Sequence, residues 1–278
     1  MATKFTHITL KEDKELVVSN KKMLCSQLRA LGIQKGMTIL VQANMKKLGY
    51  IIGDEQIVIE ALMDVVGYEG TIIVPTFTYN LLDPACQADS IDRKYWRDIR
   101  QYSLAYDKKR SAPSSDDTLA CQFLRNEGVL RSSHPLYSFA AWGKYAKFIC
   151  NEHPLHYGLN EDSPLGKLCE LNGSIVLLGC DYADCVLYKL ASYKLVQAPI
   201  KVISAPIQTA TTFEWKHMLD IAFDHIIYPD MKVLLEEHGL ISIGEIGSCE
   251  ATMFAAKDAV DLAQVYQHVK EETKTSQN

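Results

Sequence analysis

The sequence predicts an α/β protein with a central, mostly parallel sheet flanked by helices and a smaller antiparallel subregion. Two short apolar runs rich in β-branched residues, 38–42 and 71–75, enclose a helical pattern with Gly-bearing turns. A strand, a helix and a strand in such close succession indicate a βαβ unit with parallel strands. Residues 201–215 instead alternate Thr with apolar side chains, which is typical of a half-exposed antiparallel pair.

The N-terminal part of the chain supplies the first elements. Apolar periodicity predicts a helix over residues 16–31, with Ser19 as its cap and Gly32 just past its end. A second helix over 56–66 is closed by Gly67. Residues 79–113 are polar, aromatic and aperiodic, and predict a long loop insertion. Its cluster Tyr95-Trp96-Arg97 either covers a ligand or forms a satellite hydrophobic cluster under the loop.

The remainder continues the α/β pattern. Helices are expected over 119–126, 144–150, 165–171, 186–195 and 251–269, strands over 138–142, 174–179 and 239–247, and a frayed tail over 270–278. No internal repeat interrupts this order, so we expect a single domain over 1–278.

Composition excludes several classes of protein. The formal charge is −5 and Lys and Arg are scattered, so nucleic acid is not an expected partner. The start lacks an apolar signal core and no apolar run approaches the roughly 20 residues of a membrane span, which favours a cytoplasmic protein. The eight cysteines form no CxxC pair and are interpreted mainly as small buried hydrophobes.

The ends of the two parallel strands point to a ligand site. Gln42-Ala43-Asn44 stand at the end of the first strand, and Pro75-Thr76-Phe77-Thr78 at the end of the second. Ligands of parallel α/β sheets bind at the carboxyl ends of the strands. Both segments are therefore expected beside the site.

Two loops carry further candidates. Arg131, Ser132 and His134 lie close together in RSSHPLYS, which indicates either an anion contact or a loop held by its own hydrogen bonds. His153 lies in EHPLHYG, where the spacing of His and Asp fits no closed metal site and favours structural hydrogen bonding. No metal is expected.

The segment after the strand at 174–179 is the third candidate. Lys189 and Ser192 are three apart and share one face of the expected helix, and Asp181 and Asp184 occupy the loop before it. The position favours a catalytic or substrate role, against the alternative of an ordinary surface helix. The chain has no GxSxG, P-loop or GxGxxG motif, which removes the commonest hydrolase and nucleotide-binding interpretations.

Ordered blocks over nearly the whole chain resemble the aminoglycoside 3-N-acetyltransferase family, the coenzyme A dependent antibiotic N-acetyltransferases. They are LRALGIQKGMTILVQANMKKLGYIIG, ALMDVVGYEGTIIVPTFTYN, RSSHPLYSFAAWG, EHPLHYGLNEDSPLGKLCEL, SIVLLG and GEIGSCEATMFAAKDAVDLA. The resemblance implies the family's α/β fold, a cleft for the pantetheine arm of acetyl-CoA, and acetyl transfer to an amine of an aminosugar.

The catalytic block departs from the family pattern. Members carry a histidine supported by a glutamate in a block NTSLHLAEY, and the matching block here is CVLYKLASY. Lys189 therefore stands at the histidine position, Ser192 at the glutamate position and Cys185 at the asparagine position. A lysine in water has a pKa of about 10.4 and is a poor base at neutral pH. Likewise, the family's VHSSL block reads VQANM.

These observations give an explicit set of expectations. The strand-end positions and the resemblance together predict acetyl-CoA contacts by Gln42, Ala43, Asn44, Thr76, Arg131, Ser132 and Ser138, acceptor contacts by Asp181, Asp184 and Cys185, and catalytic roles among Lys189, Ser192, His134 and His153. One alternative is a catalytically silent relative that binds a partner. Another is an enzyme whose acceptor is anionic, because Lys189 is cationic. A homo-oligomer is left open.

Overall fold

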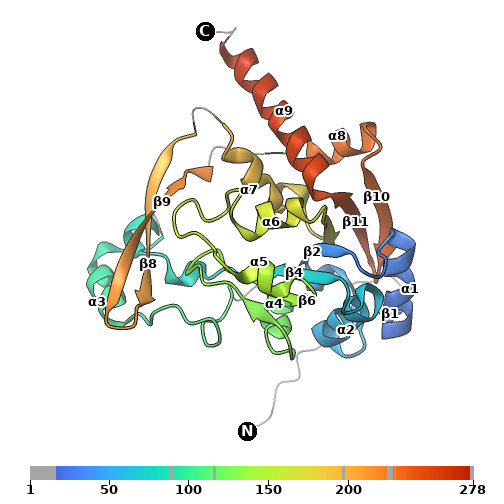
Figure 1. Cartoon of the computed structure of the whole chain (residues 1–278), viewed down its shortest axis with the longest axis horizontal. Helices are drawn as coiled ribbons and strands as arrows, with labels where there is room; N and C mark the ends of the chain where they lie inside the picture. Colours follow the sequence, from blue (N-terminus) through green and yellow to red (C-terminus); the bar gives the residue numbers. More distant parts are fainter. Residues whose placement is uncertain are drawn as a thin grey trace.

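A computed structural model describes residues 17–87, 90–114, 117–195, 198–223, 228 and 230–275, with side chains up to residue 267. Its centre is a seven-stranded sheet (Figure 1) in the order β10 (Ile241–Ile246), β11 (Cys249–Ala255), β7 (Ser174–Leu178), β2 (Thr38–Ala43), β4 (Thr71–Pro75), β6 (Phe139–Gly143) and β5 (Leu130–Arg131). The three middle strands are parallel, and every pairing outside them is antiparallel. The α/β class is confirmed, and its sheet is mixed.

Helices cover both faces of this sheet because its middle strands are apolar on both sides. Ile39 and Val41 pack on the face covered by α1 (Lys21–Leu31), α2 (Asp54–Val66) and α4 (Thr118–Phe123), whereas Leu40 between them packs on the opposite face. That second face is covered by α5 (Ala146–Cys150), α6 (Pro164–Glu170), α7 (Leu187–Ser192), α8 (Met231–Glu237) and α9 (Ala256–Thr275). Burial at successive residues on opposite faces reflects the two-residue period of a strand.

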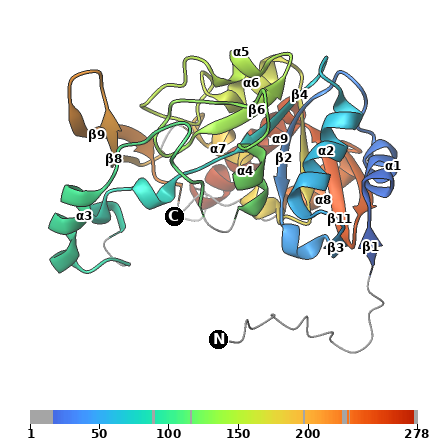
Figure 2. The ribbon, with the colours of Figure 1, turned by 90° about the horizontal axis from the view of Figure 1, so that it is seen from below.

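A separate antiparallel ribbon is formed by β8 (Ile200–Gln208) and β9 (Phe213–Ile221), as the alternating pattern predicts. The insertion 79–113 lies beside it, on the side of the molecule away from α1 (Figure 2). Instead of an irregular loop, it contains η2 (Tyr79–Leu81), η3 (Pro84–Gln87), η4 (Arg93–Tyr95) and α3 (Trp96–Tyr102).

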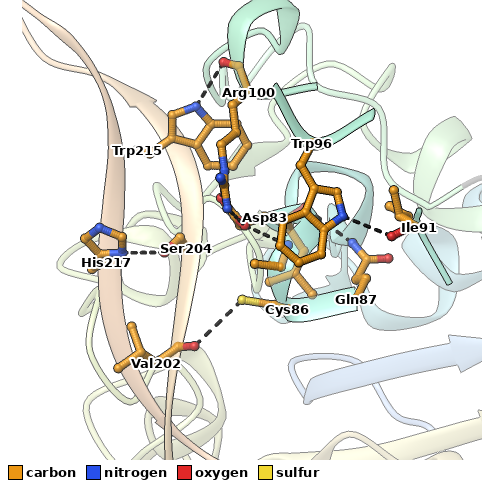
Figure 3. Close-up of polar contacts among 12 residues, drawn as sticks. Asp83, Cys86, Gln87, Ile91, Trp96, Arg100, Val202, Ser204, Trp215 and His217 are labelled. Atoms are coloured by element: carbon orange, nitrogen blue, oxygen red, sulfur yellow. Dashed lines mark hydrogen bonds and ion pairs between the residues drawn. The ribbon is translucent and has the colours of Figure 1, made fainter. Parts of the chain in front are cut away.

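Polar contacts hold the insertion together and fasten it to the ribbon (Figure 3). The Asp83 carboxylate accepts two hydrogen bonds of 2.8 Å from Arg100, and the Asp83 amide donates to the Ser204 carbonyl at 2.8 Å. Trp215 Nε1 donates to the Arg100 carbonyl at 3.1 Å. Trp96 makes its contacts within the insertion: its Nε1 donates to the Ile91 carbonyl at 2.9 Å, and the Arg100 guanidinium lies 5.7 Å from the centre of its ring.

The first helix begins later than the pattern predicts. Asn20, and not Ser19, caps α1, because its side-chain oxygen accepts the Met23 N–H at 3.1 Å. Ser19 belongs to the short strand β1 (Val18–Ser19), which pairs in parallel with β3 (Tyr50–Ile51). Gly32 ends the helix in the left-handed conformation, as expected.

The predicted helix over 251–269 is wrong in its first part. Residues Cys249–Ala255 form β11, which pairs with β10 on one side and β7 on the other. Its Ala and Met content favours a helix locally, but two rows of hydrogen bonds override that preference. Helix α9 then continues to Thr275 through most of the expected frayed tail, and residues 276–278 lie outside the described part.

Candidate active site

A groove opens where the parallel strands β2 and β4 end. It consists of two adjoining cavities of about 620 Å³ and about 300 Å³, which share Ala43, Ser114, Asp117 and Asp184. Ala43 ends β2, and Asp184 ends the turn η5 (Tyr182–Asp184) that follows β7. The groove therefore lies at the carboxyl ends of neighbouring parallel strands, where the sequence predicts a ligand site.

The larger cavity, here called the acidic cavity, is bordered by Asp54, Glu55, Asp117 and Asp184, with Lys46 as its cation. The carboxylates outnumber the ammonium groups on this wall. A cavity with this charge attracts cationic ligands and repels polyanions.

The smaller cavity, here called the apolar cavity, is lined mainly by hydrophobic groups with Lys189 as its cation. Val41 and Val74 border it near the ends of β2 and β4. The other apolar and aromatic members are Pro75, Phe77, Tyr79, Leu119 and Val186. Such a lining suits a long, weakly polar chain.

Asp117 lies at the junction of the two cavities. It caps α4, because one carboxylate oxygen accepts the Ala120 N–H at 3.0 Å. Burial raises the pKa of Asp117 above its ordinary value, although the hydrogen bond from Ala120 opposes this effect. Asp184, the other shared carboxylate, is exposed.

Lys189 reaches the apolar cavity from α7. Its side chain is half-buried, and its Nζ lies 4.6 Å from the centre of the Phe223 ring. A cation over an aromatic face is held by the ring's electron density. Thus an ammonium group is positioned where the family resemblance places a catalytic histidine.

Gln42 borders the apolar cavity, but its amide is used within the protein. Its oxygen accepts the Val186 N–H at 2.8 Å, and its nitrogen donates to the Asp184 carbonyl at 3.1 Å. The side chain therefore holds the end of β2 to the segment before α7. Ala43 and Asn44, also predicted here, border the groove directly.

Arg131 lies outside the groove. It is buried, and its Nε donates to the hydroxyls of Thr76 at 3.1 Å and Ser138 at 3.0 Å, while Nη2 donates to the Thr76 carbonyl at 2.7 Å. None of these three residues borders the groove cavities. Of the two alternatives for this loop, the geometry matches the one held by its own hydrogen bonds.

His134, within this loop, and His153, beside it, are both buried, and each ring nitrogen has a hydrogen-bonding partner. His134 Nδ1 accepts the N–H groups of Leu136 and Tyr137 at 3.1 and 2.9 Å, and its Nε2 lies 3.2 Å from the Leu155 carbonyl. His153 contacts the Ser132 hydroxyl at 2.9 Å and the Gly158 carbonyl at 2.5 Å.

The same burial sets the charge of both imidazoles. It lowers the pKa of His153 to about 4 and that of His134 well below its ordinary value. Neither residue, nor Ser132, borders the groove. A base for an amine in the groove must therefore come from another residue.

Three further candidates also lie outside the cavities. Ser192 is buried on α7, where its hydroxyl donates to the Tyr188 carbonyl at 3.0 Å and lies 2.9 Å from the Tyr228 hydroxyl. Cys185 is buried, and desolvation raises the pKa of its thiol to about 12. Asp181 is exposed and accepts the Ala183 N–H at 3.0 Å.

The groove also contains residues outside the list of candidate site residues, and not all of them have a clear signal in the sequence. Asp117 and Ser114 border both cavities, and Phe77 and Tyr79 border the apolar one. Phe77 and Tyr79 follow β4, so the strand-end rule that pointed to Thr76 reaches them as well. Asp117 precedes a helical pattern and signals only a helix cap. Within the described residues, no cluster of three or more His, Cys, Asp or Glu could hold a metal ion.

Comparison with known proteins places this architecture in one enzyme family. The family model for aminoglycoside 3-N-acetyltransferase matches residues 40–268. The chain is 34% identical over 246 residues to the SPbeta prophage-derived aminoglycoside N(3')-acetyltransferase-like protein YokD of Bacillus subtilis (strain 168), covering 88% of this chain and 90% of that protein. It is 32% identical over 269 residues to aminoglycoside N(3)-acetyltransferase VII of Streptomyces paromomycinus, covering 89% and 91%.

Solved structures agree with the sequence relatives. The crystal structure of YokD from Bacillus subtilis superposes with a TM-score of 0.85 at 33% identity, over 89% of this chain and 92% of that one. The binary complex of AAC-IIIb with CoASH superposes with a TM-score of 0.80 at 25% identity, over 91% and 97%. The fold and groove thus define a coenzyme A dependent N-acetyltransferase.

The chain belongs to the aminoglycoside 3-N-acetyltransferase family. This membership confirms the predicted family, fold and enzyme class, and it does not favour the catalytically silent alternative. No helix in the described ranges is both long and apolar enough to cross a bilayer.

Proposed function

We propose that the groove transfers the acetyl group of acetyl-CoA to an amine of a cationic aminosugar. The apolar cavity would take the pantetheine thioester, and the acidic cavity the acceptor. The observation that carries this assignment is the pair of adjoining cavities of opposite character, which meet at Asp117 and Asp184. Reacting groups bound from the two sides would meet there, which is the arrangement that direct transfer needs.

Charge supports a cationic acceptor. Asp54, Glu55, Asp117 and Asp184 border the acidic cavity, whereas Lys189 borders only the apolar one. The sequence-based alternative of an anionic aminosugar was motivated by Lys189, and the four carboxylates oppose it. The names of the relatives, which are aminoglycoside N(3)-acetyltransferases, point to the same class of acceptor.

Lys189 suits stabilisation of negative charge. Attack of an amine on the thioester carbonyl gives a tetrahedral intermediate with a negatively charged oxygen, and a positioned cation stabilises that charge. An ammonium group cannot accept a proton, so a lysine here replaces the family histidine in position and not in chemistry. Lys189 would act on the oxygen, and the base would be a different group.

The proposal includes direct transfer without a metal, by an enzyme of the cytoplasm, where acetyl-CoA is available. The packing of both helical layers on one sheet supports a single domain. Assembly into a homo-oligomer stays a prediction.

Calorimetry and a thiol assay test the function. We expect CoA to bind, and CoA release to require an amine, with kanamycin turned over faster than the anionic glucosamine 6-phosphate. Lys189→Met should keep CoA binding and lower kcat about 10²-fold or more. Lys194→Met is the matched control, because Lys194 pairs with Glu161 away from the groove. An absence of heat with CoA at high protein concentration would refute the proposal.

A further inference from the structure

The groove requires a proton acceptor that the sequence does not reveal. An amine in an aminosugar arrives largely as an ammonium, and it must lose a proton before its nitrogen can attack. His134 and His153 are engaged and lie outside the groove, and Lys189 is a cation. The remaining candidates are the carboxylates of the cavities.

Among these carboxylates, Asp117 combines position and partial burial. It borders both cavities, and it is half-buried. Asp184 also borders both cavities but is exposed, while Asp54 and Glu55 border only the acidic cavity. One oxygen of Asp117 is fixed by the Ala120 N–H, which orients the carboxylate and leaves its second oxygen outside the cap interaction.

We propose that the Asp117 carboxylate is the general base that deprotonates the acceptor amine where the two cavities meet. This inference rests on the proposed function and deepens it. It assigns Asp117 two roles, a helix cap through one oxygen and a proton acceptor through the other.

Asp117, the acceptor amine and the thioester account for every proton and bond in the reaction. The ammonium gives one proton to Asp117, and the freed lone pair forms a C–N bond to the thioester carbonyl carbon. The C–S bond then breaks, the second nitrogen proton passes to the leaving sulfur, and the products are an acetamide and CoASH. Asp117 releases its proton to water and is restored as a carboxylate.

The surroundings of Asp117 suit this role. Burial raises its pKa, which makes it a stronger base than an exposed aspartate. Its electrostatic neighbours Cys121 and Cys180 carry thiols whose pKa is also raised by burial, that of Cys180 to about 11, so both are neutral at physiological pH. The other charged or titratable groups around the cavities are Lys46, Asp54, Glu55, Tyr79, Asp184 and Lys189.

Asp117→Asn separates the base from the cap, because Asn caps helices as well as Asp does. With kanamycin as the probe amine, we expect kcat to fall about 10²-fold or more, while CoA binding measured by calorimetry and the melting temperature stay near the unaltered values. The loss should shrink as pH rises, because the amine then becomes neutral without help. Hydroxylamine, already largely neutral at pH 7.5, should be acetylated by the variant at close to the unaltered rate.

Asp92→Asn is the matched control, because Asp92 also caps a helical turn through its side chain, in the insertion and outside both cavities. Its kinetics should be unchanged. If Asp117→Asn fails to fold, Asp117→Ser retains a capping side chain and takes its place. A kcat within threefold of the unaltered protein, a change in KM for kanamycin alone, or an equal loss with hydroxylamine would overturn the assignment. Failure of the unaltered protein to bind CoA would refute the proposed function itself.

Discussion

The side-chain amide of Gln42 accepts the backbone N–H of Val186 at 2.8 Å and so connects the end of β2 to the start of α7. Its nitrogen completes the connection by donating to the Asp184 carbonyl. The position of Lys189, one turn along α7, depends on this link. A residue that borders the groove therefore acts mainly on the geometry of another.

Replacement of Gln42 tests this positioning role. Gln42→Met removes both hydrogen bonds, and we expect kcat/KM to fall about 30-fold, since two bonds of about 1 kcal/mol each are lost. Gln42→Glu should be worse, because a carboxylate oxygen then faces the Asp184 carbonyl. Steady-state kinetics and CoA calorimetry provide the measurement. Gln208→Glu changes the same residue type at an exposed ribbon end and should have no effect. Equal activity of Gln42→Met and the unaltered enzyme would contradict the role.

A second prediction concerns Ser192, which stands where the family has a glutamate. Its side chain is buried and bonded to Tyr188 and Tyr228, which leaves little room for a carboxylate. Ser192→Glu should lower the free energy of unfolding by about 3 kcal/mol or more, because an unpaired charge would be buried. Urea denaturation measures this, with Ser192→Ala, expected to lose about 1 kcal/mol, as the control. A Glu variant as stable as the Ala variant would show that α7 accommodates the family's carboxylate.

The Asp83–Arg100 pair predicts how firmly the insertion is held. The Asp83 side chain is 8% exposed, and although burial favours its neutral form, the hydrogen bonds from Arg100 keep its pKa below the ordinary value. Asp83→Asn weakens this contact between two parts of the insertion, so it should loosen the insertion and accelerate proteolysis within 79–113 several-fold, with little change in the sheet. Mass spectrometry of the fragments locates the cleavage. Arg110→Gln, which breaks the exposed pair with Asp107, is the control. Proteolysis within 79–113 should be no faster in this variant than in the unaltered protein.

Local chemistry was enough to predict the centre of the fold. The run Thr71–Pro75 follows a Gly turn and is β-branched throughout its middle, and it forms β4 with the predicted bounds. Residues Cys249–Ala255 carry no comparable local signal. Their strand exists because β7 and β10 supply hydrogen-bonding partners on both sides, and such partners are distant in sequence.

In the site, too, some residues could be predicted from local sequence and others depend on packing between distant segments. The strand-end rule places Ala43 and Asn44 at the groove, because it depends only on topology. Arg131 and His134 were predicted from loop composition, which cannot distinguish side chains that face a cavity from those that bond one another. Asp117 reaches the groove only because α4 packs beside β4 after the long insertion, and a single sequence contains no sign of that packing.

The two buried histidines predict how stability depends on pH. The imidazole of His153 is neutral in the folded protein, where its pKa is lowered to about 4, and has a pKa of about 6.5 when unfolded. Between these values the unfolded chain binds the additional proton. Stability is therefore complete above about pH 6.5 and is lost as pH falls towards 4, by about 3 kcal/mol from His153 alone. His134, whose pKa is lowered as well, should add to the loss.

Urea denaturation at pH 7.5, 6.5, 5.5 and 4.5 measures this dependence. His153→Gln cannot titrate, so its unfolding free energy should depend less steeply on pH across this window, by about one proton, although the variant is less stable at pH 7.5 because it loses fixed hydrogen bonds. His238→Gln, at an exposed position after α8, should keep the unaltered slope. An unchanged slope in His153→Gln would mean that the folded protein accepts the proton, and a structural role for a neutral His153 would then be ruled out.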